Sequence, residues 1–327
     1  MQNFEYYSPT TVDNAVAALS DKPGLTELMV GGTDTTSLLK LHILEPTRVV
    51  SLSRIPGLKG VMKAGSGVKI GAMTSLSSLM EDKAIVRSYP ALVQAIEGIA
   101  SPQHRAMNTL ASDLLQRPRC WYFRNGFGLL AKDQAGKSLV PNGENQYHAI
   151  FGNKGPAYFV SASSLGPVLV ALNAKASLHG PEGKREIPVA DLFRIPANDE
   201  ERETTLKPNE VLTEVSIPGT KAETATYEIR QRTLFDWPLA TASVALTMKG
   251  GKVEDAVVVM GHVAPTPWRS SEAENALKGK AVSDETAAAA GKAATASATP
   301  LSKNKHKVQL ASIAVKRAVL TAAGKEV

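Results

Sequence analysis

The chain has 327 residues, 43% of them hydrophobic, which is enough for two or three domains with buried cores. Its single cysteine, Cys120, excludes an internal disulfide framework and a cysteine-rich metal site built from this chain alone. The net charge is +6, but basic residues are scattered among acidic ones and only 5% of residues are aromatic, which argues against a nucleic-acid-binding protein.

The first hundred residues predict short helices and strands of a mixed α/β domain. Residues 8–11, Ser-Pro-Thr-Thr, are typical of a helix cap before an amphipathic stretch. The order of elements is not the regular βαβ alternation of a dinucleotide-binding fold, and no Gly-x-Gly-x-x-Gly occurs there. The expected elements are helices over 6–20, 74–80 and 89–99, strands over 26–30 and 48–52, and a hairpin within 57–71.

A glycine-rich turn follows the first of these strands. The sequence Leu28-Met29-Val30-Gly31-Gly32-Thr33-Asp34-Thr35-Thr36 passes from apolar residues through two glycines to hydroxyl and carboxylate side chains. Residues without a Cβ allow a close approach to a ligand, and the amides from Gly32 to Thr36 could converge on an anion. The same pattern also fits a strand, a turn and a capped helix that bind no ligand.

A second stretch combines a small, polar segment with arginines and aromatic residues. Residues 109–113 are again typical of a turn whose backbone contacts a ligand, and Arg117, Arg119 and Arg124 surround the aromatic residues 121–123. Residues 125–156 have few periodic apolar positions, and a long irregular stretch of this kind usually serves a function or an interface.

Several motifs occur in order along the chain: Gly31-Gly32-Thr33-Asp34, Ser101-Pro102-Gln103, and residues 115–124, 143–152, 168–174, 187–193 and 261–269. Together they resemble the FAD-binding (medium) subunit of molybdenum hydroxylases. The resemblance is to the xanthine dehydrogenase and carbon monoxide dehydrogenase family, in the branch of the periplasmic aldehyde oxidoreductase. It covers essentially the whole chain.

The resemblance implies an α+β chain with two parts. The first is a two-lobed FAD-binding flavoprotein fold of the vanillyl-alcohol-oxidase/PCMH type, and the second is a C-terminal α+β domain of the carbon monoxide dehydrogenase flavoprotein type. The expected domains are a first lobe at 1–55, a second lobe at 56–218 with an irregular insertion at 117–157, and the C-terminal domain at 222–327. Patterning independently predicts strands at 240–248 and 253–260 and helices at 283–298 and 307–323 in the last domain.

In the family, the first glycine loop and the strand before it hold the FAD pyrophosphate, and a second loop completes the contacts. The second loop departs here from the family pattern Thr-(Val/Ile)-Gly-Gly-Asn, since both glycines are replaced and Asp113 stands at the asparagine position. A Cβ at a former glycine can block a close approach, and a carboxylate repels a pyrophosphate, although an acidic residue at a helix start can equally be structural. The cofactor-binding residues that the resemblance implies are Glu27, Leu28, Met29, Val30, Gly31, Gly32, Thr33, Asp34, Thr35, Thr109, Ser112, Asp113 and Ile187.

Two further positions and one cluster site depart from the family. A family aspartate falls at Ser164, and a family lysine falls at Glu228. The branch also carries a 4Fe-4S cluster on four cysteines, and the positions expected beyond Cys120 fall near Leu129, Ser138 and Pro156. One thiolate cannot hold the cluster, so we predict that this chain has no 4Fe-4S cluster and that Cys120 is a small buried apolar residue.

We therefore predict an oxidoreductase subunit that passes electrons from a molybdenum centre, via 2Fe-2S clusters, to FAD and an external acceptor. The implied partners are a large molybdenum-cofactor subunit and a small 2Fe-2S subunit, which together make a heterotrimer. Two alternatives are a flavin-free scaffold subunit of the same type of complex and an isolated flavin-dependent oxidase, although the chain supplies no substrate-activating site for the oxidase.

No catalytic residue, metal site, signal peptide or membrane span is expected in this chain. The six histidines are dispersed, there is no nucleophile-elbow motif, and no window approaches the roughly 18 apolar residues of a span. The expected location is the cytoplasm, or the periplasm by export together with a signal-bearing partner.

Overall fold

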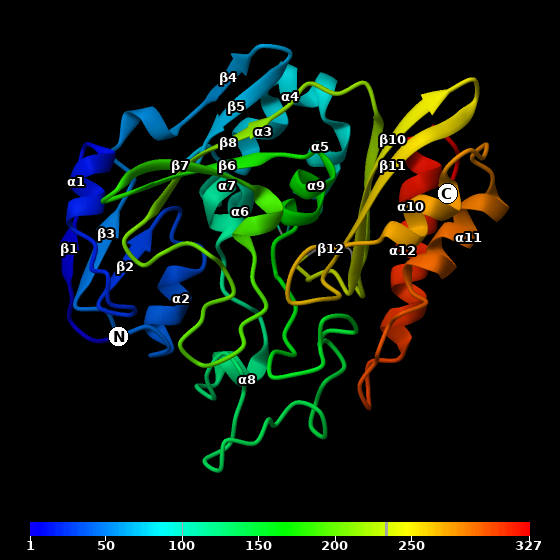
Figure 1. The fold of residues 1–327 in the computed structure, drawn as a ribbon. Coiled ribbons are helices and arrows are strands. Elements are labelled where there is room, and N and C mark those ends of the chain that lie inside the picture. Colours follow the sequence, from blue (N-terminus) through cyan, green and yellow to red (C-terminus); the bar gives the residue numbers. More distant parts are fainter. Residues whose placement is uncertain (100, 233–234) are drawn as a thin grey trace.

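Three β-sheets, each made of one stretch of the chain, organise the computed structural model, which describes residues 1–99, 101–232 and 235–327 (Figure 1). The strand orders are β1-β3-β2, β4-β5-β8-β6-β7 and β12-β11-β10-β9. The strands are β1 (Glu5–Tyr7), β2 (Thr26–Met29), β3 (Arg48–Ser51), β4 (Val61–Ala64), β5 (Gly67–Gly71), β6 (Lys175–Gly180), β7 (Gly183–Pro188), β8 (Val211–Ile217), β9 (Glu223–Ile229), β10 (Ala240–Lys249), β11 (Lys252–Gly261) and β12 (Trp268–Arg269).

The helices cover these sheets and are mostly short. They are α1 (Val12–Ala17), α2 (Thr35–Lys40), α3 (Leu76–Glu81), α4 (Lys83–Ser88), α5 (Pro90–Glu97), α6 (Pro102–Met107), α7 (Leu110–Leu114), α8 (Trp121–Arg124), α9 (Leu165–Ala171), α10 (Ser271–Leu277), α11 (Asp284–Ala294) and α12 (His306–Ala322), with 3-10 turns at Pro56–Leu58 and Val189–Leu192. Within the described ranges, no helix has both the length and the apolar character needed to cross a membrane.

The small N-terminal sheet is parallel and corrects one prediction. Tyr6 and Tyr7 do not begin a helix; they form β1, in which Tyr6 pairs with Val49 of β3. The helix starts only at Val12, because the side chain of Thr11 accepts a hydrogen bond from the amide of Asn14 and so fixes the N-terminus there. The strands expected at 26–30 and 48–52 are present as β2 and β3.

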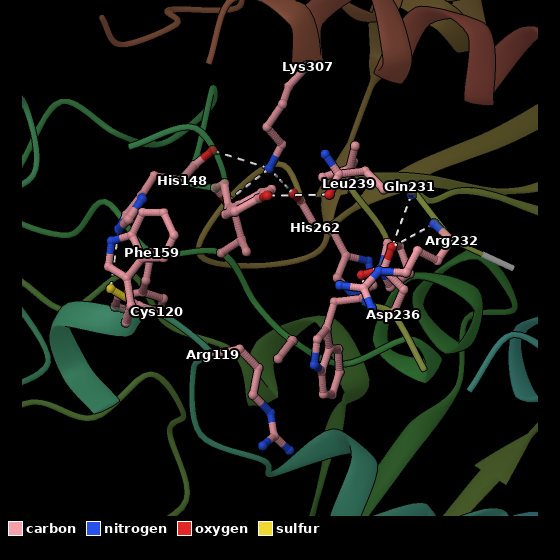
Figure 2. Close-up of a pocket in the computed structure, with 16 residues that line it drawn as sticks. Arg119, Cys120, His148, Phe159, Gln231, Arg232, Asp236, Leu239, His262 and Lys307 are labelled. Atoms are coloured by element: carbon pink, nitrogen blue, oxygen red, sulfur yellow. Dashed lines mark hydrogen bonds between the residues drawn. The ribbon is translucent and has the colours of Figure 1, made fainter. Parts of the chain in front are cut away.

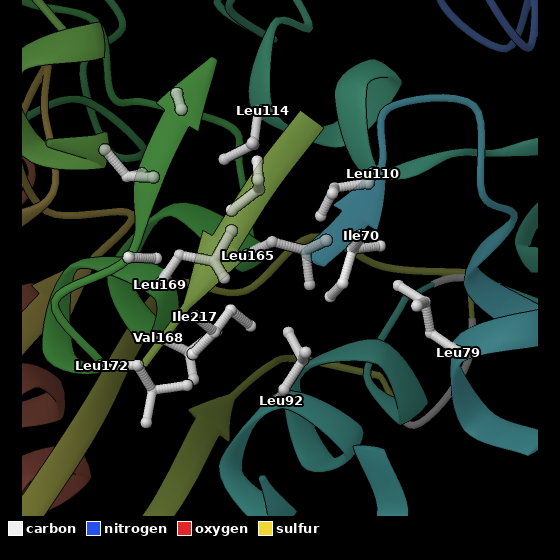
Figure 3. Close-up of a cluster of buried hydrophobic side chains, with 14 of the residues drawn as sticks. Ile70, Leu79, Leu92, Leu110, Leu114, Leu165, Val168, Leu169, Leu172 and Ile217 are labelled. Atoms are coloured by element: carbon white, nitrogen blue, oxygen red, sulfur yellow. The ribbon is translucent and has the colours of Figure 1, made fainter. Parts of the chain in front are cut away.

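The main hydrophobic core lies between the five-stranded sheet and the helices packed against it (Figure 3). Ile70 of β5 and Ile217 of β8 supply the sheet side of this core. Leu92, Leu110 and Leu165, from α5, α7 and α9, supply the helix side, and all five side chains are buried. Helix α7 is the second loop of the sequence motif, so this core fixes the loop to the sheet.

The C-terminal sheet packs against the long helix α12 in a second core, which includes many alanines. Small side chains let the helices approach closely: a Cβ on Gly291 of α11 would lie 2.2 Å from the carbonyl oxygen of Ser312 on α12. The elements predicted from patterning are confirmed here, as β10, β11, α11 and α12.

The irregular insertion hangs below the sheets in Figure 1 and is tied to the last part of the chain. Asn145 donates from Nδ2 to the Oγ of Ser302 at 2.9 Å, and Asn304 donates from Nδ2 to the carbonyl of His148 at 3.1 Å. The buried Lys307 donates from Nζ to the carbonyl oxygens of Tyr147, His148 and His262 at 3.1, 3.2 and 2.7 Å. Three carbonyls thus satisfy the three donors of one ammonium group.

Candidate functional site

The first glycine loop joins β2 to α2 and touches the second loop directly. The amide of Gly31 donates to Oγ of Ser112 at 3.2 Å, and the Thr33 hydroxyl donates to Oδ1 of Asn108 at 3.4 Å. A Cβ on Gly31 would lie only 2.1 Å from the carbonyl oxygen of Met107. Glycine at 31 is therefore required by the contact between the two loops, before any ligand is considered.

Four consecutive amides of the first loop are free. Gly32 has a φ of +71°, which turns the chain, and the first intraloop bond runs from the amide of Thr36 to the carbonyl of Gly32 at 3.3 Å. Among the described residues, no acceptor lies within hydrogen-bonding reach of the amides from Gly32 to Thr35. Successive free amides that converge on one point can form a nest for an anion such as a phosphate.

Asp34 is bound by three arginine residues instead of capping its own helix. Its Oδ1 lies 3.1 Å from Nη1 of Arg119 and 2.9 Å from Nη2 of Arg124, and its Oδ2 accepts the backbone amide of Arg117 at 2.8 Å. The side chain is 10% exposed. Asp34 therefore ties the first loop to the arginine-rich segment, and its charge is neutralised before it can repel a bound anion.

The backbone amides of residues 110–113 in the second loop are all hydrogen-bonded within the chain. It forms the start of α7, where Oγ1 of Thr109 caps the amide of Ser112 at 3.2 Å and the carbonyl of Thr109 accepts the amide of Asp113 at 3.0 Å. The amides of residues 110 and 111 donate to the carbonyls of Thr74 and Ala72, both at 3.0 Å. The expected ligand-binding turn is thus a capped helix start, because Thr109 supplies the N-cap and Ala111 favours the helix.

Asp113 faces away from the first loop. Its Oδ2 accepts hydrogen bonds from the Ser163 hydroxyl at 2.6 Å and the Leu165 amide at 2.9 Å, and its Oδ1 accepts from Nε2 of Gln116 at 3.1 Å. The carboxylate therefore caps the N-terminus of α9 from outside, since Ser164 makes no side-chain cap of its own. Burial raises the pKa of Asp113 to about 6, while the Ser163 and Leu165 donors oppose that rise. Asp113 therefore has a structural role at a helix start, which was one of the two interpretations that its sequence position allowed.

A cavity of about 390 Å³ adjoins the first loop, and we call it the loop cavity. Its walls come from residues 23–52, 111–129 and 199–212. Seven of the residues expected to bind the cofactor line it: Glu27, Leu28, Val30, Gly32, Asp34, Thr35 and Ser112. Residues outside this lining are Met29, Gly31, Thr33, Thr109, Asp113 and Ile187, and Ile187 pairs with Ala176 in the β6–β7 hairpin and packs against the main core.

The sequence did not reveal the partners that complete this region. Gln116 bridges Asp113 and the carbonyl of Ala162, and Arg117 pairs with the buried Glu203 at 2.5 Å. Ala162 lies 46 residues from Gln116, and Glu203 lies still farther from Arg117, so no local spacing could have indicated these two partners.

Glu228 stands on β9, at the position where the family resemblance implies a lysine, and its side chain is 6% exposed. Its Oε2 accepts from Nη2 of Arg230 at 2.6 Å, and burial raises its pKa to about 7. A Cβ on Gly98 would lie 2.0 Å from this oxygen, so the carboxyl group rests directly on the backbone at Gly98. The departure at 228 is accommodated by a neighbouring arginine and a glycine.

Cys120 packs at the edge of a small apolar cluster formed by Leu130, Ala157 and Phe159, with Leu129 beside it. Its Sγ lies 3.2 Å from Nε2 of His148, and burial raises its pKa, which favours the thiol. In the part of the chain that the structure describes, no group of three or more His, Cys, Asp or Glu residues is placed to hold a metal ion. The absence of a 4Fe-4S cluster stays a prediction.

Comparisons with known proteins match this geometry to a family. The family described as "FAD binding domain in molybdopterin dehydrogenase" matches residues 2–220, and "CO dehydrogenase flavoprotein C-terminal domain" matches residues 225–322. The chain belongs to this family of molybdenum hydroxylase flavoproteins. The resemblance and the fold class predicted from the sequence are thereby confirmed.

Relatives of known function cover nearly the whole chain. The carbon monoxide dehydrogenase medium chain of Hydrogenophaga pseudoflava is 29% identical over 97% of this chain and 96% of its own length. The aldehyde oxidoreductase FAD-binding subunit PaoB of Escherichia coli is 28% identical over 95% of each chain. These relatives confirm the predicted class, an oxidoreductase subunit of the FAD-binding type.

A solved structure of carbon monoxide dehydrogenase from Hydrogenophaga pseudoflava matches the fold with a TM-score of 0.77, 28% identity and coverage of 99% of this chain and 98% of that one. Quinoline 2-oxidoreductase from Pseudomonas putida 86 also has a TM-score of 0.77, at 21% identity and the same coverage, and shows the fold alone.

Proposed function

We propose that this chain binds FAD through the first glycine loop and serves as the electron-transfer subunit of a molybdenum-containing dehydrogenase. The observation that carries the proposal is the run of four free amides from Gly32 to Thr35, beside a cavity that Gly32 and Thr35 line. The oxygens of a pyrophosphate would accept hydrogen bonds from these amides without displacing an existing hydrogen bond. For Ile187 and the other predicted residues that do not line the cavity, only the family resemblance supports a role in FAD binding.

The residues of this chain would bind and orient the cofactor. When bound, the flavin supplies the redox chemistry, and no side chain is needed as a general acid or base. Asp34 would hold the loop in place through Arg119 and Arg124, which keeps its carboxylate from the anion. Electrons would arrive from a large molybdenum-cofactor subunit through a small 2Fe-2S subunit and leave to an external acceptor. We also propose the domain division at 55/56 and 218–222, because each of the three sheets lies within one of these ranges.

The alternative, a flavin-free scaffold subunit, is favoured by a different observation. The amides of residues 110–113 are all satisfied within the chain, so the second loop offers no backbone donors to a ligand. FAD would then depend on the first loop alone, and binding would be weaker than with two open loops. This difference makes the two proposals separable by measurement.

The test is an absorption spectrum of the purified protein, before and after acid release of any cofactor. Flavin bands with about one FAD per chain support electron transfer. A colourless protein that stays colourless with excess FAD overturns the proposal and leaves the scaffold. The variant Thr35→Glu places a carboxylate beside the free amides, and we expect it to weaken FAD binding about tenfold or more by repulsion of the pyrophosphate. The exposed control Thr10→Glu leaves binding unchanged.

A further inference from the structure

One wall of the loop cavity comes from a short hairpin loop, residues 193–204, which carries Arg202. The base of this hairpin loop is fixed, because Phe193 pairs with Thr204 as an antiparallel bridge and is buried in the main core. Arg202 lies two residues before Thr204, and its side chain lines the cavity. The anchored base therefore holds a charged side chain at the cavity wall.

The guanidinium of Arg202 makes only long contacts within the chain. Its Nη1 lies 3.9 Å from Oε2 of Glu27, and its Nη2 lies 3.8 Å from Oε1 of Glu203. Both distances exceed that of a hydrogen bond, and the side chain donates no hydrogen bond to any described residue. The side chain is 36% exposed, so it is accessible to a ligand in the cavity.

The other basic residues that line the described part of the loop cavity are less well placed to bind an anion. Nε of Arg117 lies 2.5 Å from Oε1 of Glu203, so this charge is already paired. Lys207 is 56% exposed, and its nearest carboxylate, Glu182, is 91% exposed. The Lys207 charge therefore lies at the surface, where water screens it.

The arginines that follow the second loop are bound to Asp34. Arg119 and Arg124 both pair with its Oδ1, at 3.1 and 2.9 Å. Figure 2 shows Arg119 at the edge of a second cavity, of about 240 Å³, where its guanidinium also lies 4.6 Å from the centroid of the Trp237 ring. These two charges neutralise Asp34 and are not free for a ligand.

Carboxylates also line the loop cavity, so an anion bound there needs a positive charge beside it. The acidic residues of the lining are Glu27, Asp34, Asp199, Glu200, Glu201 and Glu210. Asp34, Asp199, Glu201 and Glu210 each pair with a cation from outside the lining. Glu200 is exposed, and Glu27 has its long contact with Arg202. A phosphate at the first loop would be repelled by Glu27 unless a cation balances both charges.

A row of charged contacts connects Arg202 with the first loop. Asp34 accepts the backbone amide of Arg117 at 2.8 Å. The side chain of Arg117 pairs with Glu203, which in turn lies 3.8 Å from Arg202. Burial alone would lower the pKa of Arg202, but the surrounding carboxylates, that of Asp34 included, raise it above its usual value. Arg202 therefore stays charged and interacts electrostatically with the first loop.

We propose that Arg202 binds the phosphate groups of the ligand that occupies the first loop. On binding, its guanidinium exchanges the long contacts to Glu27 and Glu203 for charge-assisted hydrogen bonds to phosphate oxygens, since two of its N–H groups can donate in parallel. The free amides from Gly32 to Thr35 bind other oxygens of the same group. This inference rests on the proposed function, because it assigns a counter-charge to the pyrophosphate of FAD.

The first experiment is calorimetry of FAD and ADP binding to the full chain, after dialysis against concentrated salt has removed any bound flavin. We expect Arg202→Gln to bind both ligands about tenfold more weakly, because charge-assisted hydrogen bonds are lost. Arg202→Lys keeps the charge without the planar guanidinium and weakens binding about threefold. Added salt weakens binding to the wild type more than to Arg202→Gln, since one screened charge is missing in the variant. An equal salt dependence overturns the proposal.

The matched control is Arg194→Gln. Arg194 belongs to the same hairpin loop, is 39% exposed and lies 3.4 Å from Glu201, but it does not line the cavity. This variant should leave the affinity for FAD and ADP unchanged. Equal losses in Arg202→Gln and Arg194→Gln contradict the assignment, because they would reflect the charge or the fold of the hairpin loop in general.

A second experiment uses inorganic pyrophosphate and tests the competition for Arg202. Glu27→Gln removes the carboxylate beside the guanidinium, and we expect pyrophosphate to bind about threefold more tightly. Glu200→Gln makes the same change at an exposed position of the lining and should have little effect. Equal gains in the two variants would show a general effect of charge and would contradict the pairing of Glu27 with Arg202.

The outcomes separate this inference from the proposed function. If the wild type and Arg202→Gln bind FAD equally well, Arg202 is not a phosphate ligand, and the electron-transfer function is unaffected. If ADP binds in a way that depends on Arg202 but FAD does not bind, the electron-transfer function fails and the phosphate site remains. A wild-type chain that binds neither FAD, ADP nor pyrophosphate overturns both.

Discussion

The two loops that the family uses for FAD differ here in what their backbones offer. The first loop leaves the amides of Gly32 to Thr35 free and borders a cavity. The second loop, which contacts the first loop at Gly31, is a capped helix start in which every amide from residue 110 to 113 has a partner. One side of the site is open to an anion, and the other has become structural.

The comparison teaches that a loop whose amides are all bonded within the chain can still be required for the geometry of its neighbour. Ser112 and the carbonyl of Met107 contact Gly31, and Asp113 fixes α9. The second loop and the residues before it therefore help to hold the first loop in place. Substitutions in the first loop should change both stability and FAD binding, whereas those in the second should change mainly stability.

The largest effect is expected from Asp34→Ala. This change removes the acceptor of Arg119 and Arg124 and leaves their partly buried charges without this carboxylate, so we expect the free energy of unfolding to fall by about 3 kcal/mol. Chemical denaturation measures this loss. Asp284→Ala, at an ion pair whose carboxylate is 67% exposed, is the control and should change stability by less than about 1 kcal/mol. Equal effects would show that the Asp34 cluster does not hold the loop.

Gly31→Ala comes next. Its new methyl group would meet the carbonyl of Met107 at 2.1 Å, so the loops must separate, and we expect a loss of about 2 kcal/mol in stability together with weaker FAD binding. Gly57→Ala has no atom within 4 Å of its new Cβ and should be nearly neutral. A stable Gly31→Ala protein with unchanged FAD binding would contradict the described contact between the loops.

Asp113→Asn tests the second loop by its pH dependence. The folded pKa of about 6 lies above the unfolded value of about 3.9, so the contribution of this carboxyl to stability is present below pH 4 and is lost as the pH rises through 6. The variant lacks this titration. Its free energy of unfolding relative to the wild type should therefore rise by about 2 kcal/mol between pH 4 and pH 8.

Denaturation of both proteins across this pH range measures the difference, and FAD affinity measured in parallel should change less than twofold. A large gain in FAD affinity on removal of the charge would show that Asp113 faces the cofactor after all.

The smallest effect is expected from Thr109→Ala, which removes the N-cap of α7. The loss of one cap should lower stability by about 1 kcal/mol, as should Ser270→Ala at the cap of α10. Neither change should reduce FAD affinity, because Thr109 does not line the loop cavity. A tenfold loss with Thr109→Ala alone would restore the second loop as a direct cofactor contact.

The sequence predicted the elements with strong local signals. The helices and strands of the C-terminal domain, and the first loop with its glycines, follow from periodicity and turn chemistry. The prediction of a helix from residue 6 was wrong, because Tyr6 and Tyr7 are extended by pairing with β3, about 40 residues later. Strands β6 to β8 were not predicted; they are completed by pairing across the main sheet.

The location of the candidate site was predictable from the sequence, but the hydrogen-bond and ion-pair partners within it were not. The motif indicated where the first loop lies, whereas the partners of Asp34 are 83 to 90 residues away. The direction of Asp113 could not be read from the sequence either, since its donors at Ser163 and Leu165 come from beyond the insertion. Contacts of this range depend on the assembled fold.

The carbonyl cage around Lys307 has a consequence for the order in which the chain assembles. The insertion is complete once residue 157 has been synthesised, yet its closing contacts come from Ser302, Asn304 and Lys307. About 150 further residues must leave the ribosome before these carbonyls find their donors. The insertion therefore cannot form these hydrogen bonds until the segment that leads into α12 has been synthesised.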